Sequence, residues 1–386
     1  MMRTSTLALC LLSQHSTPYK RWLDEEEKRR RDRRYPRISL RTFRYSSLYK
    51  VYASRCDQAL LNATGHDFNS FDNLLRLFAP FYHLYTFDDE IGRIRKKILE
   101  DGKPKGRPRD LSACGCLGLV LMWYRTKGSC ARTLSMMFGQ TSTPMYKWLK
   151  FGRKVLLHVL SRHDAAKVKL PTAAESEGFK AAVAEKYPYC PDVWGAGDGL
   201  KLFIDAPTTY SKQLRYYNGW KCSHYISCVF VFSVDGKIRV AILNAPGNFH
   251  DSTIADYGFY TNLEEVYDRD GGKVVVDSAF AVRNAPYLIK SSQTNPFDMR
   301  GIAVNEQATS IRQLSEWGMR IIQATFPRLK DPLRYEEYGD RMIILKLMVC
   351  LYNYQTEMMG QNQIFNSYMN KDEGYYGYDD INEYYF

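Results

Sequence analysis

The chain has 386 residues, enough for about two domains of ordinary size. Apolar residues make up 45% of it, so composition supports a large core and excludes a chain that is disordered throughout. The formal net charge of +12 favours a polyanionic partner, although a well-solvated basic surface would also account for it.

The cysteine pattern argues against a disulfide or zinc framework, and the hydropathy argues against a membrane-spanning or secreted protein. The nine cysteines are scattered, odd in number and without zinc-binding spacing, so we expect reduced thiols in an intracellular protein. Apolar runs stay shorter than the roughly 18 residues that a membrane span needs. The apolar run Leu7–Leu12 is also too short for the core of a typical signal peptide.

The N-terminal part is rich in charge. We expect residues 1–55 to form a basic, poorly ordered arm. Its most basic block, Lys28 to Arg34, is either a solvated charged face or a signal for nuclear import or phosphate contact.

Residues 68–160 are expected to form a helical domain. Helical periodicity runs over 68–100 with a break near Pro80, and a Pro/Gly/basic linker follows at 101–110. Residues 111–160 then predict a helix, a short helix ending at Gly139 and a longer helix with Pro144 in its first turn.

That order is typical of a helix-turn-helix, and a solvated basic face on a helical bundle is the alternative. The longer helix carries its basic residues on one polar side, where they would hold DNA phosphates. The predicted DNA contacts of this unit are Arg132, Lys147, Lys150, Arg153 and Lys154.

The second half of the chain predicts an α/β domain over 193–350. A connector at 161–192 with a short helix around Ser176–Tyr187 leads into it. Strand-like runs, including a pair joined by a Val-Asp-Gly-Lys turn, predict a mixed sheet with helices on both faces. An apolar helix near the end packs on the sheet, and 366–386 is an acidic, Tyr-rich tail.

Two aspartates stand in β-prone, apolar runs. Asp198 lies in WGAGDGLKLFI and Asp277 ends the strand of KVVVDSAF. Strand interiors disfavour carboxylates, so two of them need a reason. A shared divalent metal is a good one, because hard cations take carboxylate oxygens and offset their desolvation.

The third acid of such a site is expected to be Glu316. It lies on an amphipathic helix over 308–330 and shares a polar face with Arg312 and Arg320, which we expect to contact DNA. A surface ion pair is the alternative role for Glu316, and Glu306 is the nearest alternative ligand.

His250 and Asp251 form a separate candidate pair. They follow a Pro246-Gly247 turn, and Asp251 falls in the first turn of a helix, where an acid is favoured by the helix dipole. The pair either caps that helix or orients the carboxylates that would hold metal.

Taken together, these motifs resemble those of PIF/Harbinger superfamily transposases and their domesticated nuclease relatives. The matching segments are GAGDGLKL, the Tyr-rich RYYNGWKCSHYISCVFVF, the PG-x-x-HD motif at 246–251, the strand before Asp277, and Glu316 ahead of Phe326-Pro327-Arg328-Leu329-Lys330. Pro327 is unusual after the Phe of that last motif.

The resemblance implies an RNase H-like DDE endonuclease with catalytic and metal-binding acids Asp198, Asp277 and Glu316. It implies two Mg²⁺ or Mn²⁺ ions and double-stranded DNA, as transposon ends and target, and family members often work with a separately encoded Myb-like DNA-binding protein. A nuclear location, no membrane association and a homo-oligomer are further expectations. The alternatives are a transposon-derived DNA-binding protein that no longer cuts and, ranked below it, a hydrolase that uses His250 as base.

Overall fold

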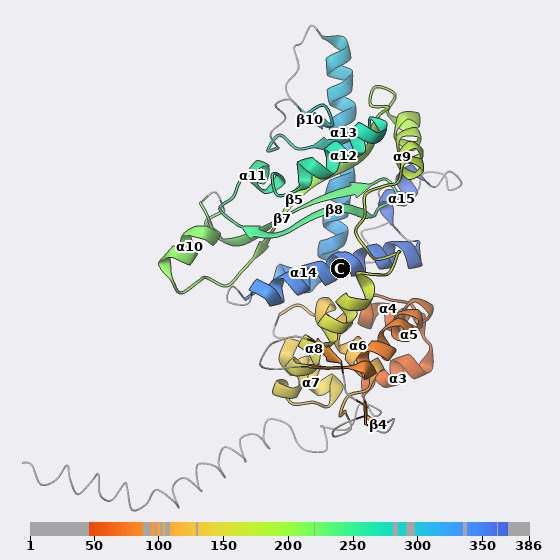
Figure 1. Cartoon of the computed structure of the whole chain (residues 1–386), viewed down its shortest axis with the longest axis vertical. Helices are drawn as coiled ribbons and strands as arrows, with labels where there is room; N and C mark the ends of the chain where they lie inside the picture. The colour runs from red at the N-terminus through yellow and green to blue at the C-terminus, as the bar shows by residue number, and fades with distance from the viewer. Residues whose placement is uncertain are drawn as a thin grey trace, which may run out of the picture.

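The computed structural model describes most of the chain between residues 46 and 369. The described ranges are 46–87, 94–96, 99–100, 103–104, 109–128, 130–219, 221–280, 285–290, 298–334, 338–360 and 362–369. The basic block at 28–34, the linker at 105–108 and the tail from 370 lie outside them. A helical unit lies at one end of the described molecule and an α/β unit at the other (Figure 1).

The helical unit is built around one buried helix, α6. Because apolar or small residues surround α6 on all sides, it packs in the middle of the unit against its neighbours α4, α5, α7 and α8. The helices are α3 Ser47–Ser54, α4 Asp57–Thr64, α5 Phe68–Leu84, α6 Ala113–Arg125, α7 Cys130–Phe138 and α8 Ser142–Leu160. The short strands are β1 Tyr85–Phe87, β2 Ile94–Lys96, β3 Leu99–Glu100 and β4 Lys103–Pro104.

Two sequence predictions for this unit are wrong. Ordered structure begins before residue 55, because Ser46 caps α3 through its side chain. The helix predicted over 68–100 does not break at Pro80; it continues to Leu84 and is followed by β1 and β2. Pro80 removes one backbone bond near the helix end, and burial of Phe78 and Tyr82 on either side of it holds the last turns in place.

The order α6, α7, α8 matches the predicted helix, short helix and longer helix. Gly139 has a φ of 63°, a left-handed conformation that glycine adopts without a Cβ penalty, and it ends α7. The next helix begins with Thr141 as N-cap and Pro144 in its first turn.

A six-stranded mixed sheet forms the α/β unit. Its path is β10-β9-β5-β7-β6, with β8 pairing on β7. Strand β7 is antiparallel to both β5 and β8, whereas β5, β9 and β10 run parallel. The strands are β5 Val193–Phe203, β6 Tyr217–Asn218, β7 Ser223–Ser233, β8 Ile238–Pro246, β9 Lys273–Val276 and β10 Leu288–Lys290.

Local sequence explains the hairpin between β7 and β8. The predicted Val-Asp-Gly-Lys turn is present, with Gly236 at a φ of 81°. The Ser233 amide donates to the Lys237 carbonyl across it. Almost every residue of β7 is buried, as expected of a central strand covered on both faces.

Helices cover both faces of this sheet, as predicted. Helices α9, α11 and α12 contact the sheet strands, and so do α13 and α14 (Figure 1). Their bounds are α9 Ala173–Lys186, α10 Tyr210–Tyr216, α11 Asp251–Ala255, α12 Phe259–Asp270, α13 Met299–Thr325, η3 Pro327–Lys330, α14 Tyr338–Met359 and α15 Gln363–Tyr368. The final helix, α15, occupies the start of the tail predicted over 366–386.

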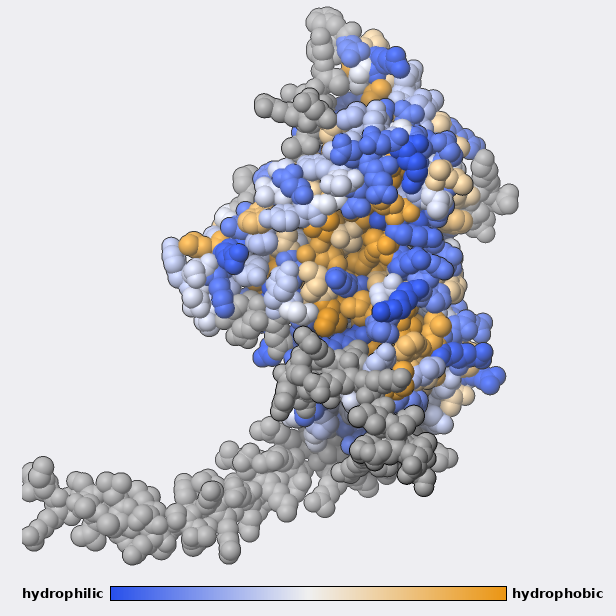
Figure 2. Space-filling view, viewed as in Figure 1, coloured by the Kyte–Doolittle hydropathy of each residue, from blue (hydrophilic) through white to orange (hydrophobic). Residues whose placement is uncertain are grey.

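The two units share one continuous hydrophobic core. Helix α14 packs on β8 as expected, and also on α8 of the helical unit. The Tyr124 hydroxyl donates to the Ile344 carbonyl at 2.8 Å, and the Tyr124 ring lies 5.6 Å from that of Phe326. Apolar side chains gather in a band across the middle of the molecule in Figure 2, with hydrophilic ones above and below. In the part of the chain that the structure describes, no helix is long and apolar enough to cross a membrane.

Candidate active site

Asp198, in the middle of β5, lies beside Asp277, which directly follows the neighbouring strand β9. Strands β5 and β9 pair in parallel, with Gly197 opposite Val276 as the last pair. Asp198 and Asp277 are the next residues on each strand, so the register brings their positions together. The prediction that these two aspartates occupy neighbouring strands is confirmed.

Alternating glycines let other elements approach β5 beside Asp198. A Cβ on Gly197 would lie 3.1 Å from the Phe259 ring, and one on Gly199 would lie 3.1 Å from the Asp251 carboxyl carbon. Gly199 therefore leaves the space that the Asp251 carboxylate occupies. The run Gly-Ala-Gly-Asp-Gly thus puts a second carboxylate against the strand that carries Asp198.

Asp251 is the first residue of α11, and one of its carboxylate oxygens is unusual. Its Oδ1 is buried and has no hydrogen-bond partner among the described residues. Burying an unpaired carboxylate oxygen is costly, so such atoms in folded proteins commonly mark a site for an ion or ligand. His250 precedes it as the N-cap without a side-chain capping bond, and its exposed ring contacts the Ser252 hydroxyl at 3.2 Å. His250 therefore has no described contact with the aspartates.

The pKa of Asp198 reports this crowding of acids. The pKa is raised from 3.8 to about 6, chiefly by burial and also by the negative charges of Asp277 and Asp251, while the Gly199 amide and Arg312 act to lower it. The Gly199 amide donates to Asp198 Oδ1 at 2.6 Å. The carboxylates repel each other in a partly desolvated space, which is the electrostatic condition that a bound cation relieves.

Arg312 connects the sheet to the helix that carries Glu316. Its Nη1 donates to Asp277 Oδ1 at 2.7 Å and its Nη2 to Glu316 Oε1 at 3.2 Å. Arg312 and Glu316 are four residues apart and therefore share one face of α13. The guanidinium thus lies between Asp277 and Glu316 and offsets the charge of both.

The other residues predicted around Glu316 lie away from this cluster. Arg320 is exposed one turn further along α13, and Glu306 is exposed ten residues before Glu316. At 1.5 Å per residue, Glu306 is roughly 15 Å from Glu316 along the helix. The structure therefore links Glu316, rather than Glu306, to Asp277 through the Arg312 guanidinium.

The donor set fits hard divalent cations such as Mg²⁺ or Mn²⁺ in chemistry. Carboxylate oxygens crowd together, and the buried Oδ1 of Asp251 lacks a partner. Within the described ranges, however, no three His, Cys, Asp or Glu side chains converge closely enough to hold a metal ion. Glu316 is 48% exposed and contacts Arg312, so it faces the aspartates through a guanidinium.

The basic residues of α8 divide into two groups. Lys147 is exposed, whereas Lys150 pairs with Asp340 of the α/β unit at 3.1 Å. Arg153 is only 5% exposed, and its guanidinium lies 4.8 Å from the centre of the Trp123 ring. Lys150 therefore pairs with α14 and Arg153 packs on α6, so both of these predicted DNA contacts are engaged within the protein. Lys154 is half-buried, and Arg132 belongs to α7 at a point where only the backbone is described.

The ion pair predicted as the alternative role of Glu316 is present, with Arg312 as its partner. The sequence did not predict the contact of Arg312 with Asp277 or the orphaned oxygen of Asp251. Arg312, for which the sequence predicts DNA contact, stands four residues before Glu316, and this spacing is the local signal for their ion pair. Its ion pair with Asp277 joins residues 35 positions apart and has no local signal. For the position of Asp251 against β5, the signal in the sequence is Gly199, whose missing side chain leaves room for the Asp251 carboxylate.

The segment that matches a known protein family includes this site. Residues 197–353 match the family model described as DDE superfamily endonuclease. The matched segment contains Asp198, Asp251, Asp277, Arg312 and Glu316 and ends within α14. No curated protein and no solved structure matches the chain. The family match points to a transposase-like nuclease.

Proposed function

We propose that this chain is a metal-dependent DNA endonuclease that cuts and joins phosphodiester bonds, related to the PIF/Harbinger transposases. The observation that carries the proposal is the position of Asp198 beside Asp277 on the parallel strands β5 and β9, with Glu316 joined to Asp277 through Arg312. The family match over the same residues supports it. Its alternative is a DNA-binding protein that no longer cuts.

An RNase H-like catalytic domain is part of this proposal. Strand order supports it: three antiparallel strands, β5, β7 and β8, are extended on the β5 side by the parallel strands β9 and β10. In this arrangement one acid in the middle of β5 lies beside a second that follows β9, and the long helix α13, which packs on both strands, carries the third. Rigid elements on all sides are what a preorganised site needs.

Asp198, Asp277 and Glu316 would hold the two Mg²⁺ or Mn²⁺ ions, with Asp251 beside Asp198. Bound divalent ions activate the attacking oxygen and stabilise charge on the leaving oxygen in phosphodiester cleavage. The Gly199 amide fixes the Asp198 carboxylate through one oxygen. Arg312 offsets the charge of Asp277 and Glu316 and supplies a guanidinium suited to a DNA phosphate.

The substrate we propose is double-stranded DNA in the nucleus. The net charge of +12 supports a polyanion. The order α6, α7, α8 supports a helix-turn-helix, for which Lys147, Lys154 and Arg132 remain proposed DNA contacts. A Myb-like protein partner and a homo-oligomer are further proposals that rest on the resemblance alone.

The decisive experiment is a cleavage assay with Mg²⁺ on the DNA that flanks the chain's own coding sequence. The full-length protein should nick or cut this DNA only when Mg²⁺ or Mn²⁺ is present. The Asp277→Asn protein is the control: it keeps the fold and loses one oxygen charge. Equal cleavage by both proteins, or cleavage in EDTA, would overturn the proposed mechanism.

One observation favours the alternative of a silent DNA-binding protein. Arg312 already neutralises Asp277 and Glu316, so these two acids are held without a metal. A calorimetric Mg²⁺ titration separates the two functions. Binding of two ions that is lost in Asp198→Ala supports the nuclease, and DNA binding without any such metal binding supports the silent protein.

A further inference from the structure

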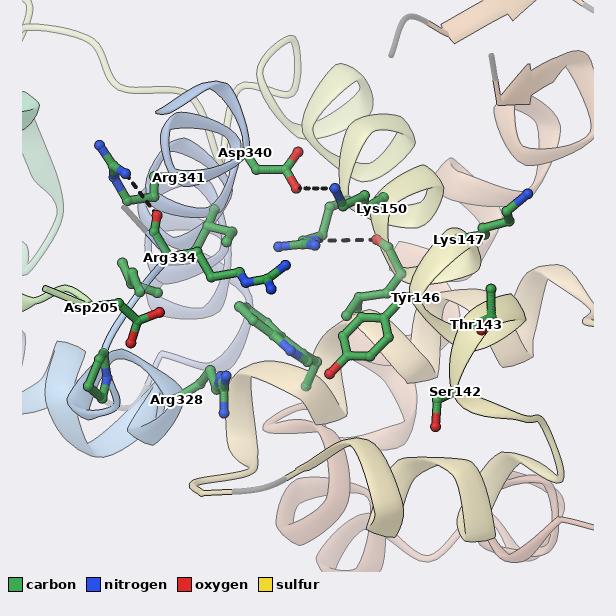
Figure 3. Close-up of a pocket in the computed structure, with 16 residues that line it drawn as sticks. Ser142, Thr143, Tyr146, Lys147, Lys150, Asp205, Arg328, Arg334, Asp340 and Arg341 are labelled. Atoms are coloured by element: carbon green, nitrogen blue, oxygen red, sulfur yellow. Dashed lines mark hydrogen bonds and ion pairs between the residues drawn. The ribbon is translucent and has the colours of Figure 1, made fainter. Parts of the chain in front are cut away.

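A large cavity lies where the helical unit meets the α/β unit. Its volume is about 930 Å³, within the range of sites that hold small molecules or several phosphate groups. One wall comes from α6 and α8, and the other from η3, residues 332–334 and the start of α14 (Figure 3). It is separate from the acidic cluster described above.

The charge of this cavity is strongly one-sided. Its cations outnumber its acids by six to two: Lys147, Lys150, Arg153, Arg328, Arg334 and Arg341 against Asp205 and Asp340. Two of the cations are paired with acids: Lys150 with Asp340 across the cavity (Figure 3) and Arg328 with Asp331 outside its lining, so the remaining lining still carries more cations than acids. Clustered cations in a concave, partly desolvated space concentrate a positive potential and attract anions.

The buried arginines of the cavity are held in place by neighbouring groups. Arg153 and Arg328 both stack on Trp123, with guanidinium carbons 4.8 and 5.2 Å from the ring centre. Arg341 is 1% exposed and donates to Asn244 at 3.0 Å and to the Arg334 carbonyl at 2.8 Å. These charges are therefore fixed as part of the cavity walls.

Cations on the solvent side complete the cavity. Lys147 and Arg334 are both exposed, and Arg334 reaches toward α8 from the segment before α14 (Figure 3). Arg328 has a buried Nε without a hydrogen-bond partner among the described residues. The cavity thus combines fixed positive charges with cations that solvent can reach.

We propose that this cavity binds phosphate groups, and that their source is the backbone of the DNA substrate. The DNA source rests on the proposed function; phosphate binding itself does not. The two elements that carry the acids lead into the cavity: β5 continues from Asp198 toward Asp205, and α13 continues from Glu316 into Arg328. Both paths cover roughly 20 Å at the usual rise per residue.

That separation suits one DNA molecule that touches both sites. A duplex advances 3.4 Å per base pair, so roughly 20 Å correspond to about six base pairs. A strand cut at the acidic cluster would have its backbone held about half a helical turn away. A free polyphosphate has the same chemistry, and the experiment below distinguishes it from DNA.

The test compares DNA binding by a cavity variant and by a matched control in EDTA, so that cleavage plays no part. The cavity variant is Lys147→Ala with Arg334→Ala. The control is Arg162→Ala with Lys169→Ala, which removes one Arg and one Lys that are exposed between α8 and α9. Fluorescence anisotropy measures the affinity of each full-length protein for a labelled 30-base-pair duplex between 50 and 200 mM salt.

Loss of two phosphate contacts should reduce the slope of log affinity against log salt by about 1.8 in the cavity variant only. Lys147→Arg with Arg334→Lys keeps both charges and should retain the slope of the unmodified protein. This second variant shows that charge, rather than a change in fold, accounts for the loss.

A second arm titrates inorganic tripolyphosphate and follows thermal unfolding. Stabilisation that is absent only from the cavity variant, with equal DNA slopes in all proteins, identifies a free polyphosphate as the ligand. If neither DNA slope nor tripolyphosphate response differs between cavity variant and control, the phosphate site is wrong. If the protein cleaves DNA but the cavity variant binds DNA and tripolyphosphate as the control does, the nuclease proposal stands and the phosphate site is wrong. If the cavity variant loses phosphate binding but the unmodified protein does not cleave DNA, the phosphate site stands and the nuclease proposal is wrong.

Discussion

The Arg312 guanidinium lies 2.7 Å from the Asp277 carboxylate and joins α13 to the end of strand β9. The same guanidinium contacts Glu316, so one cation links two of the three acids that we propose as metal ligands. Arginine and a divalent metal would therefore compete for the same oxygens. The charge of Arg312 should therefore weaken the binding of a divalent metal to these oxygens.

Replacing Arg312 with Gln should strengthen Mg²⁺ binding. A unit charge about 4 Å away contributes about 1 kcal/mol even at the dielectric constant of water, so affinity should rise about fivefold or more. Unfolding in urea should change by less than about 1 kcal/mol, because these ion pairs are partly exposed. Calorimetric titration measures the affinity. The control is Arg320→Gln, which changes an exposed residue about two turns after Arg312 on α13. Equal Mg²⁺ affinities in the two variants would contradict the competition between Arg312 and the metal.

Replacing Glu316 with Gln should abolish cleavage and leave folding nearly intact. Glu316 is 48% exposed, so its ion pair with Arg312 contributes less than about 1 kcal/mol to stability. Loss of a metal ligand should lower the cleavage rate by more than about a hundredfold, since even residues that only support a ligand cost about 10–100-fold. Mn²⁺ should restore part of it. The matched control is Glu306→Gln; if that variant is the inactive one, the third ligand has been misplaced.

The raised pKa of Asp198 makes stability depend on pH in a defined direction. Between the unfolded value of 3.8 and the folded value of about 6, the folded protein binds more protons than the unfolded one. The contribution of Asp198 to stability therefore falls as pH rises through about 4 to 6. Asp198→Asn removes this penalty and should stabilise the protein at pH 7 by up to about 3 kcal/mol.

Urea unfolding of the unmodified and Asp198→Asn proteins from pH 4 to pH 7 measures this effect. The two stability curves should converge near pH 4 and separate above it. Mg²⁺ should stabilise the unmodified protein at pH 7 and have a weaker effect on the variant. Parallel curves across the whole range would show that Asp198 is not desolvated in the folded protein.

Adding a methyl group at residue 199 tests the approach of Asp251. The new Cβ would lie 3.1–3.2 Å from all three atoms of the Asp251 carboxyl group, so that group must move. Gly199→Ala should weaken metal binding and cleavage together. Gly178→Ala, on an exposed face of α9 with nothing within 4 Å, should instead stabilise the protein by about 0.5–1 kcal/mol. Unchanged metal binding in Gly199→Ala would remove Asp251 from the site.

Arg153 should behave as a structural residue. It is buried and stacked on Trp123, so Arg153→Ala should destabilise the protein by about 1–3 kcal/mol. Exposed Lys147 lies on the same helix, and its change to Ala should alter stability by less than about 0.5 kcal/mol. Thermal or urea unfolding compares the two. Similar stabilities would mean that Arg153 is more accessible to solvent, and to DNA, than the structure has it.

The fold was predictable to the extent that its signals are local. Apolar periodicity indicated α6, α8 and α13, and the Asp235-Gly236 turn indicated the hairpin of β7 and β8. The helix through Pro80 was not predictable, because the burial of Phe78 and Tyr82 that maintains it depends on distant residues. The predicted arm ends too late and the predicted tail begins too early, because α3 begins at Ser47 and α15 ends at Tyr368. Capping and packing extend these helices beyond what composition indicates.

The sequence by itself determined which acids stand in strands and which stands on a helix, because strand and helix patterns depend on near neighbours. Tertiary structure decided what those acids touch. The parallel register of β5 and β9 sets Asp198 beside Asp277, across 79 positions of the chain. Packing of α13 on the sheet places Arg312 between Asp277 and Glu316, and packing of α8 on α6 sets the buried Arg153 against Trp123. Contacts between such distant residues depend on strand order and helix docking, which no local pattern encodes.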